Sequence, residues 1–144
     1  IPTSDIEFWD LDGDGREELA VIEGFHGNNV AVFKEEMGSY VRALDLPAAF
    51  GHVLWAGPIL GRPALIVGSR AERKALTLYR LQAGDDGKLF VEQQAELDQG
   101  QAPAQITVLE DGRTLLTTNH DVGELAKYTL SCKDSPADAT KGDS

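Results

Sequence analysis

Residues 10–18 form the acidic run Asp-Leu-Asp-Gly-Asp-Gly-Arg-Glu-Glu, in which four of the five carboxylates are candidates to bind one ion. Asp10, Asp12 and Asp14 alternate with short residues, and Glu18 ends the group. Oxygens at this spacing can surround one hard cation, and Ca²⁺ accepts six to eight oxygen ligands in irregular geometry. We therefore predict a Ca²⁺ site whose ligands are these four side chains and the backbone carbonyl of Arg16.

The residues after this loop favour a strand over a helix. An EF-hand has a bidentate Glu at the twelfth position of its loop, where this chain has Val21. Residues 19–22 form an apolar, partly β-branched run that is typical of a buried strand. The loop is therefore expected to join two strands, with Gly13 and Gly15 permitting positive φ in the tight turn. A solvated acidic turn that binds no metal is the alternative interpretation.

The strand–loop–strand pattern over residues 6–33 resembles the FG-GAP/VCBS family of calcium-binding β-propeller repeats. The signature of that family is a strand, a D-x-D-x-D-G loop and a second strand, as in the run IEFWDLDGDGREELAVIE. The resemblance implies a propeller blade around residues 6–33 and bound Ca²⁺. Relatives of the repeat resemble propellers attached to sugar-processing lyases and dehydratases.

Short strands separated by Gly, Asp, Asn and Pro recur along the chain, without a sustained helical period. Aligning the chain on itself gives three units, at approximately residues 5–46, 47–99 and 100–131. A period in the forties with four short strands predicts propeller blades. We therefore expect an all-β fold of about three four-stranded antiparallel blades, forming part of a propeller. An unrelated sandwich with evenly spaced hairpins is the alternative.

Aromatic residues set the register of these units. Phe33, Tyr79 and Tyr128 each end a third strand, and Trp9 and Trp55 align on first strands near the interior. The expected strands cover residues 6–9, 18–22, 29–33, 40–44, 52–55, 63–67, 75–81, 88–94, 104–109, 113–118 and 125–130. Only the first unit keeps the acidic loop, so one metal site is expected.

Three units are too few to close a propeller, which has typically four to eight blades. The chain begins with Ile1, so we expect a processed form or a piece of a longer polypeptide. Further blades of that polypeptide or self-association would then close the ring, two copies giving six blades. Apolar side chains such as Ile22, Val32, Leu116 and Tyr128 are expected on the end faces. Residues 132–144 are polar and are expected to be a disordered tail.

A second candidate site lies on the opposite face of the predicted blades from the metal loop. The loops after second and fourth strands leave this face, and they carry His26, Asn28, His52, Arg70, Asn119 and His120. Imidazole, amide and guanidinium groups could bind a carboxylate or a sugar hydroxyl. The three histidines could also hold a transition metal, since three nitrogen ligands plus water form a catalytic zinc pattern. Turns favour His and Asn in any case, so the grouping also arises without function.

Composition and motifs exclude several classes of function. The net charge is −11 and no basic face is clustered, so we predict no binding to nucleic acid or to a membrane. The sequence contains no P-loop, dinucleotide fingerprint or Gly-x-Ser-x-Gly motif. Cys132 is the only cysteine, so no intrachain disulfide forms. No apolar run approaches the ~18 residues of a membrane span.

Two hypotheses of function follow. The first is a non-catalytic, calcium-stabilised propeller module that binds a carbohydrate or a protein. The second is part of a sugar-processing enzyme, similar to a lyase or dehydratase, with its active site on the histidine-lined face. Fold analogy alone does not decide between them. For either function we expect an extracellular or periplasmic location.

Overall fold

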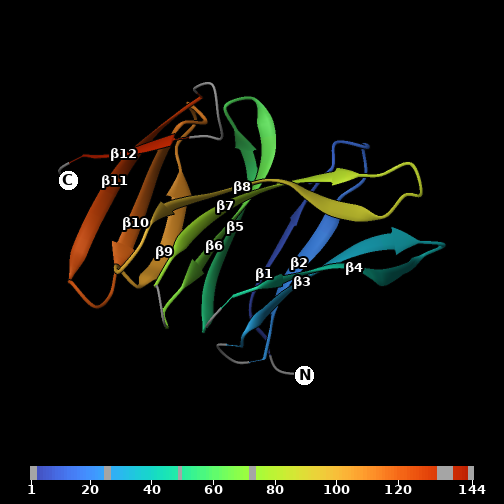
Figure 1. Cartoon of the computed structure of the whole chain (residues 1–144), viewed down its shortest axis with the longest axis horizontal. Coiled ribbons are helices and arrows are strands. Elements are labelled where there is room, and N and C mark those ends of the chain that lie inside the picture. The colour runs from blue at the N-terminus through green and yellow to red at the C-terminus, as the bar shows by residue number, and fades with distance from the viewer. Residues whose placement is uncertain (1–2, 25–26, 49, 72–73, 133–137, 143–144) are drawn as a thin grey trace.

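The computed structural model describes residues 3–24, 27–48, 50–71, 74–132 and 138–142. These residues form twelve β-strands and no helix (Figure 1). Within them, therefore, no helix is long and apolar enough to cross a membrane. The strands are β1 (Thr3–Trp9), β2 (Glu18–Glu23), β3 (Asn29–Glu36), β4 (Ser39–Pro47), β5 (Gly51–Ile59), β6 (Arg62–Ser69), β7 (Leu76–Ala83), β8 (Leu89–Asp98), β9 (Pro103–Val108), β10 (Thr114–Asn119), β11 (Glu124–Ser131) and β12 (Asp138–Gly142).

The strands form three separate four-stranded sheets, each a run of antiparallel hairpins. The first sheet is β1–β4, the second β5–β8 and the third β9–β12, and within each sheet every strand pairs with its neighbours in the sequence. The all-β prediction is confirmed, and each of the eleven expected strands overlaps an observed one. The described parts of the three sheets do not close into a ring.

The twelfth strand differs from the sequence prediction. Residues 138–142 were expected to belong to a disordered tail, but they form β12, whose residue Lys141 pairs with Tyr128 on β11. The polar segment has no apolar alternation that would indicate a strand. Its backbone nevertheless pairs with the edge of β11, which would otherwise leave N–H and C=O groups without partners.

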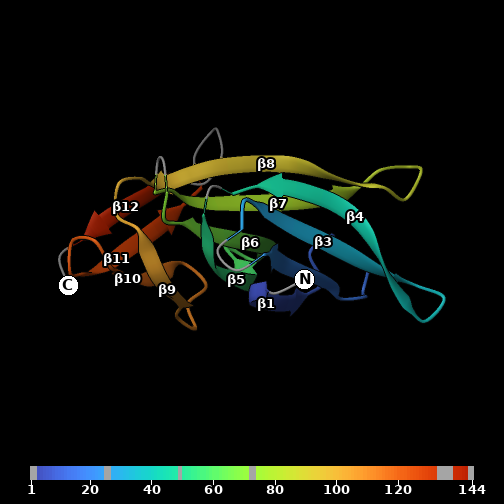
Figure 2. The same ribbon diagram turned by 90° about the horizontal axis from the view of Figure 1, so that it is seen from below.

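The second sheet lies between the other two and packs on both (Figures 1 and 2). Successive residues of a strand point to opposite faces, so neighbouring residues of β6 enter different cores. Leu65 packs with Ile22 and Val32 of the first sheet, whereas Ile66 packs with Leu115 of the third. Both faces of the second sheet are therefore covered by apolar side chains.

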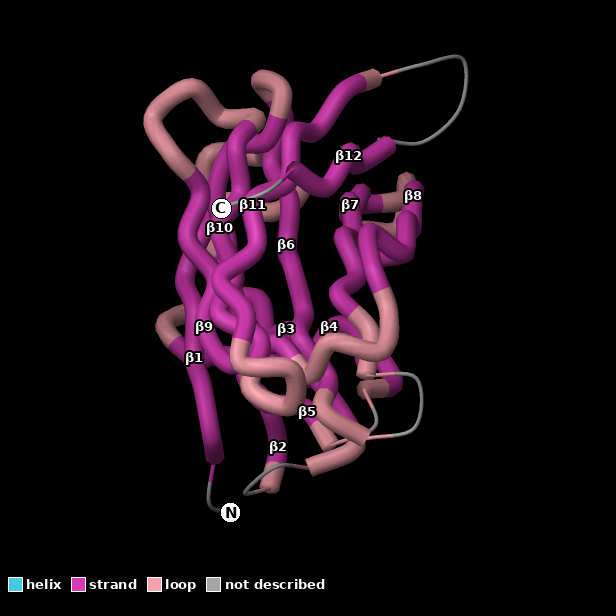
Figure 3. Tube along the Cα trace, turned by 90° about the vertical axis from the view of Figure 1, so that its left-hand side faces the viewer, coloured by secondary structure: helices cyan, strands magenta, loops and turns pink. Residues whose placement is uncertain are grey.

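The first strands of the sheets lie beside one another. β1 contacts β5, and β5 contacts β9. Viewed from the side of the third sheet, β9 and β10 lie in front of the second sheet (Figure 3). The three sheets are therefore stacked face to face, with their first strands along a common edge.

The aromatic repeat occupies equivalent positions in the three sheets. Each aromatic residue pairs with a leucine of the preceding strand, in the pairs Leu19–Phe33, Leu65–Tyr79 and Leu115–Tyr128. The alignment of the two tryptophans is wrong. Trp9 pairs with Glu18, the residue before Leu19, whereas Trp55 pairs with Ile66, the residue after Leu65. Since Leu19 and Leu65 are equivalent, the two tryptophans lie two positions apart in register. Trp9 is also 38% exposed, because it stands at the last position of β1, beside the loop.

The two outer faces of the stack differ in chemistry. Ile22, Val32 and Tyr128, which were expected on uncovered faces, are buried against the second sheet. The outer face of the first sheet carries Ile6 and Phe8, both substantially exposed, in register with other apolar residues of β2 and β3. The outer face of the third sheet is mostly polar, with exposed Thr107, Thr118, Lys127 and Thr129 around Leu116 and Leu125.

Candidate functional site

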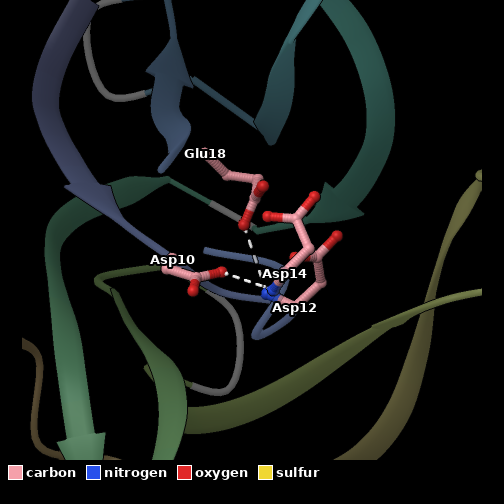
Figure 4. Close-up of side chains that lie close together, drawn as sticks. All are labelled: Asp10, Asp12, Asp14 and Glu18. Carbon is pink, nitrogen blue, oxygen red and sulfur yellow. Dashed lines mark hydrogen bonds between the residues drawn. The ribbon is translucent and has the colours of Figure 1, made fainter. Parts of the chain in front are cut away.

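The loop between β1 and β2 brings the four predicted carboxylates together (Figure 4). One ligand atom each from Asp10, Asp12, Asp14 and Glu18 lies within 4.8 Å of the others. Oxygens on opposite sides of one Ca²⁺ are separated by up to about 5 Å, so the group has the dimensions of a cation site. It could hold a metal ion, and it is the one such group of three or more acidic, histidine or cysteine ligands among the described residues.

Asp10 organises the loop backbone. Its Oδ1 accepts hydrogen bonds from the N–H groups of Gly13 at 2.8 Å and Asp14 at 3.0 Å, and its Oδ2 accepts one from Gly15 at 2.8 Å. Gly13 and Gly15 have φ of 78° and 91°, as the sequence predicted. This left-handed backbone turns successive N–H groups towards a single carboxylate, which holds the loop in a cupped shape.

The other two aspartates use one oxygen each within the loop. Asp12 Oδ1 accepts the N–H of Asp14 at 3.1 Å, and Asp14 Oδ1 accepts the N–H of Arg16 at 2.8 Å. A carboxylate offers about four lone-pair sites, so each side chain retains acceptor capacity for a cation. The side chain of Arg16 is 68% exposed, which suits a residue expected to contribute through its carbonyl.

Glu18 is buried, at 1% exposure. Its Oε2 accepts the N–H groups of Leu11 at 2.6 Å and Asp12 at 3.2 Å, which ties the loop to the start of β2. Burial raises the pKa of Glu18 to about 7, and the charge of Asp12 adds to this, while the two N–H bonds act in the opposite direction. A cation beside Glu18 would favour its ionised form.

Lys34 is a member of the site that the sequence analysis missed. Its ammonium on β3 lies 2.6 Å from Asp12 Oδ2 and 3.4 Å from Asp14 Oδ2. The pairing of Leu19 with Phe33 brings the following residue of β3 beside the loop. The hairpin register was therefore the signal that could have revealed Lys34, since 20 residues separate it from Asp14 in the chain.

The structure describes five of the six residues predicted for the second face, and it brings two of them into direct contact. Arg70 and His120 meet, with a guanidinium nitrogen 3.0 Å from His120 Nδ1. Beside them, Lys74 Nζ lies 2.6 Å from Asp121 Oδ2. The Nε of Arg70 is buried and has no hydrogen-bond partner among the described residues. This group is a surface cluster of charges at the ends of the second and third sheets.

The side chains of Asn119 and Asn28 make hydrogen bonds within the fold. His26 lies outside the described residues. Asn119 is buried, accepts the Thr117 hydroxyl at 3.0 Å and donates to Glu124 at 3.0 Å. Asn28 Oδ1 accepts the N–H of Phe50 at 3.1 Å. The Asn119 side chain therefore fixes the end of β10 and does not face a ligand site.

His52 lines a different cavity, between the first strands of the three sheets. This cavity has a volume of 460 Å³, and Asp5, Glu7 and Gln105 also line it. Asp5 Oδ2 accepts the N–H of Leu54 at 2.8 Å. Burial, and secondarily the charge of Asp5, raises the pKa of Glu7. Within the described residues, no cluster of three potential metal ligands includes a histidine, so the structure gives no zinc site there.

In comparisons with known proteins, no family model matches the chain and no curated protein matches it. The resemblance to FG-GAP/VCBS repeats therefore rests on the loop motif and its strand–loop–strand setting. The chemistry of the site is inferred below from its own geometry.

Proposed function

We propose that this chain is a calcium-stabilised β-propeller module of the FG-GAP/VCBS type, which binds a carbohydrate or a protein and is not itself catalytic. The observation that carries the proposal is the group of four carboxylates in the loop of the first hairpin. Bound there, Ca²⁺ would fix the connection between β1 and β2 and offset the negative charge of the loop.

The ligand chemistry supports Ca²⁺ over other ions. All four side chains offer hard oxygen donors, and sulfur or nitrogen ligands that would favour zinc are absent from this described cluster. Mg²⁺ needs near-ideal octahedral geometry and keeps several waters. A loop with carboxylates at positions one, three, five and nine, and the Arg16 carbonyl at position seven, suits the larger and more tolerant Ca²⁺.

The arrangement of the sheets supports the propeller part of the proposal. Three consecutive four-stranded sheets stack with their first strands adjacent, as blades do around an axis. The outer face of the first sheet exposes Ile6 and Phe8. A further sheet, from the parent polypeptide or from a second copy of this chain, would cover that face as the second sheet covers the inner one.

Thermal unfolding with and without calcium tests the module. Added Ca²⁺ should raise the melting temperature, and a chelator should lower it again, because only the folded loop gathers the carboxylates. Asp10→Asn should abolish most of this response, whereas Asp85→Asn, at an exposed site in the β7–β8 turn, should retain it. A melting temperature that ignores both calcium and chelator would refute a structural calcium site.

An extracellular or periplasmic location is part of the proposal. Calcium sites of extracellular modules bind with Kd of about 10⁻⁴–10⁻³ M. A partly exposed loop whose aspartates are already paired with the ammonium of Lys34 suits this weak range. A Kd in the nanomolar range would instead favour a cytosolic calcium buffer.

A second candidate is catalysis at the cavity lined by His52. The observation that favours it is Glu7, whose pKa is raised by burial and by Asp5 in the same cavity. A carboxyl group with a raised pKa in the same cavity as an imidazole could act as a general acid on a sugar, as in a lyase or dehydratase. Release of unsaturated sugar products from uronic-acid polysaccharides, lost in Glu7→Gln, would establish this function; no release would leave the binding module.

A further inference from the structure

A cleft opens between the first and second sheets, at the end opposite the metal loop. Its volume is 460 Å³, within the usual range of about 300–1,000 Å³ for small-molecule sites. The first sheet contributes Asn28, Pro47 and Ala48 to its wall. From the second sheet, the polar lining consists of Ser69, Thr77, Tyr79 and Gln94, with Val67, Ala71 and Ala75 as the apolar part.

Strand pairing places these polar groups on one face of the second sheet. Tyr79 on β7 pairs with Leu65 and with Gln94, and Thr77 pairs with Val67. The same face forms the apolar core nearer the metal loop, where Leu65 and Val67 pack against the first sheet. Towards the cleft, hydroxyl groups therefore replace the aliphatic side chains.

The three hydroxyl groups that line the cleft have no hydrogen-bond partner within the described part of the chain. Tyr79, Thr77 and Ser69 are only 5%, 8% and 9% exposed, yet their side chains make no hydrogen bond to any described residue. None of the three is among the fully buried side-chain atoms that lack a partner, so each hydroxyl is accessible from the cleft and free to bond to a ligand. Burial also raises the pKa of Tyr79, so its hydroxyl keeps a proton that it can donate.

The wall of the cleft opposite these hydroxyls belongs to the first sheet, and a backbone hydrogen bond holds it in place. Ala48 donates its N–H to the carbonyl of Asn28 at 3.0 Å. The side-chain oxygen of Asn28 is held by the N–H of Phe50 at 3.1 Å. Its amide NH₂ group therefore has a defined position at the wall of the cleft, from which it can donate to a ligand.

We propose that this cleft binds one unit of a neutral sugar. This inference rests on the proposed ligand-binding function, and it names the class of the ligand and the site that binds it. A sugar hydroxyl both donates and accepts, so it can satisfy Ser69, Thr77 and Tyr79. Its C–H faces can contact the apolar wall around Val67 and Pro47. An apolar ligand would leave the hydroxyls unpaired.

Charge argues for a neutral sugar over an acidic one. None of the residues lining the cleft is charged, so a carboxylate or phosphate would have no counter-charge within it. The strand partner of Thr77 on β8 is Glu96, which is exposed. Its carboxylate disfavours an anion and can accept hydrogen bonds from sugar hydroxyls.

Titration followed by amide NMR tests the site directly. The probes are the neutral methyl glycosides of glucose, galactose, mannose and xylose, with glucuronate as the charged comparison. At least one neutral glycoside should shift the amide signals of Ser69, Thr77 and Tyr79 saturably, and glucuronate should not. Tyr79→Phe should weaken that binding about tenfold, the usual effect of one lost hydrogen bond. Tyr40→Phe removes a hydroxyl from the outer face of the first sheet and should leave binding unchanged.

The outcomes separate this inference from the proposed function. Saturable shifts confined to the Arg70–His120 cluster would overturn the cleft but keep a ligand-binding module. No saturable shift with any neutral glycoside would overturn the sugar site. The calcium response of the melting temperature, measured on the same samples, tests the module independently. Wild-type melting behaviour in Tyr79→Phe would show that its weaker binding does not arise from unfolding.

Discussion

The ammonium of Lys34 lies 2.6 Å from Oδ2 of Asp12, whose side chain has no exposed surface. A cation from the neighbouring strand thus already neutralises part of the loop charge. It stands next to the oxygens that a calcium ion would use, so Lys34 and Ca²⁺ would compete electrostatically for the same carboxylates. The charge of this lysine would then affect both the stability of the calcium-free loop and the affinity for calcium proposed above.

Lys34→Met should have opposite effects on these two properties. Without calcium, the buried carboxylate of Asp12 loses its partner, and the free energy of unfolding should fall by about 3 kcal/mol. Calcium affinity should rise about tenfold, because a positive charge next to the ion is removed. Urea unfolding and calorimetric titration measure the two effects. Lys127→Met, an exposed change on the third sheet, is the control; unchanged calcium affinity in Lys34→Met would contradict the competition.

Glu18 should make the calcium-free protein less stable as pH rises. Burial raises its pKa from the usual 4.5 to about 7, so the folded state favours the protonated form. This contribution is fully present below about pH 4.5 and is lost as pH rises through about 7. A pKa difference of this size corresponds to on the order of 3 kcal/mol. Glu18→Gln should remove this part of the pH dependence of urea unfolding; an unchanged profile would contradict the assignment.

Calcium binding should in turn release a proton from Glu18. The ion needs the carboxylate form, so calcium affinity should fall as pH drops below about 7. At pH 6, titrations in two buffers of different ionisation enthalpy should show release of close to one proton per ion. Proton release that persists in Glu18→Gln would assign it to another group.

Tyr128 connects the third sheet to the second through a partly buried hydrogen bond. Its hydroxyl donates to Asp98 Oδ2 at 2.6 Å, and burial together with this bond raises the pKa of Tyr128. Tyr128→Phe should lower the free energy of unfolding by about 2 kcal/mol, the usual loss for a hydrogen bond to a charged group. Tyr40→Phe, at a half-exposed ring, should cost much less. Equal losses in both variants would show that the bond contributes nothing.

The outer face of the first sheet should drive association of this chain. Phe8 and Tyr40 are 45% and 46% exposed and pack edge to face, with ring centroids 6.1 Å apart. Sedimentation of the chain alone should show a particle larger than 15.6 kDa. Phe8→Glu should shift it to the monomer, because a carboxylate on this face cannot be buried without a partner. Met37→Glu, at a fully exposed turn, should not; a wild-type monomer would contradict self-association.

The sequence by itself determined the strands and the acidic loop. Both depend on neighbouring residues: alternation and β-branched residues indicate strands, and the spacing from Asp10 to Glu18 places oxygens around a point. The aromatic residues at positions 33, 79 and 128 also gave the correct repeat. β12 escaped detection because its pairing depends on the edge of β11 rather than on its own residues.

Only the tertiary structure decided which side chains meet across the sheets. Lys34 joins the acidic loop because of hairpin register, and Tyr79 faces the cleft because two sheets end there. Sequence likeness paired Trp9 with Trp55, but backbone pairing puts them two positions apart. Local pattern fixes which way a side chain points along its own strand. Register and sheet packing, which sum many weak contacts between distant residues, fix what that side chain touches.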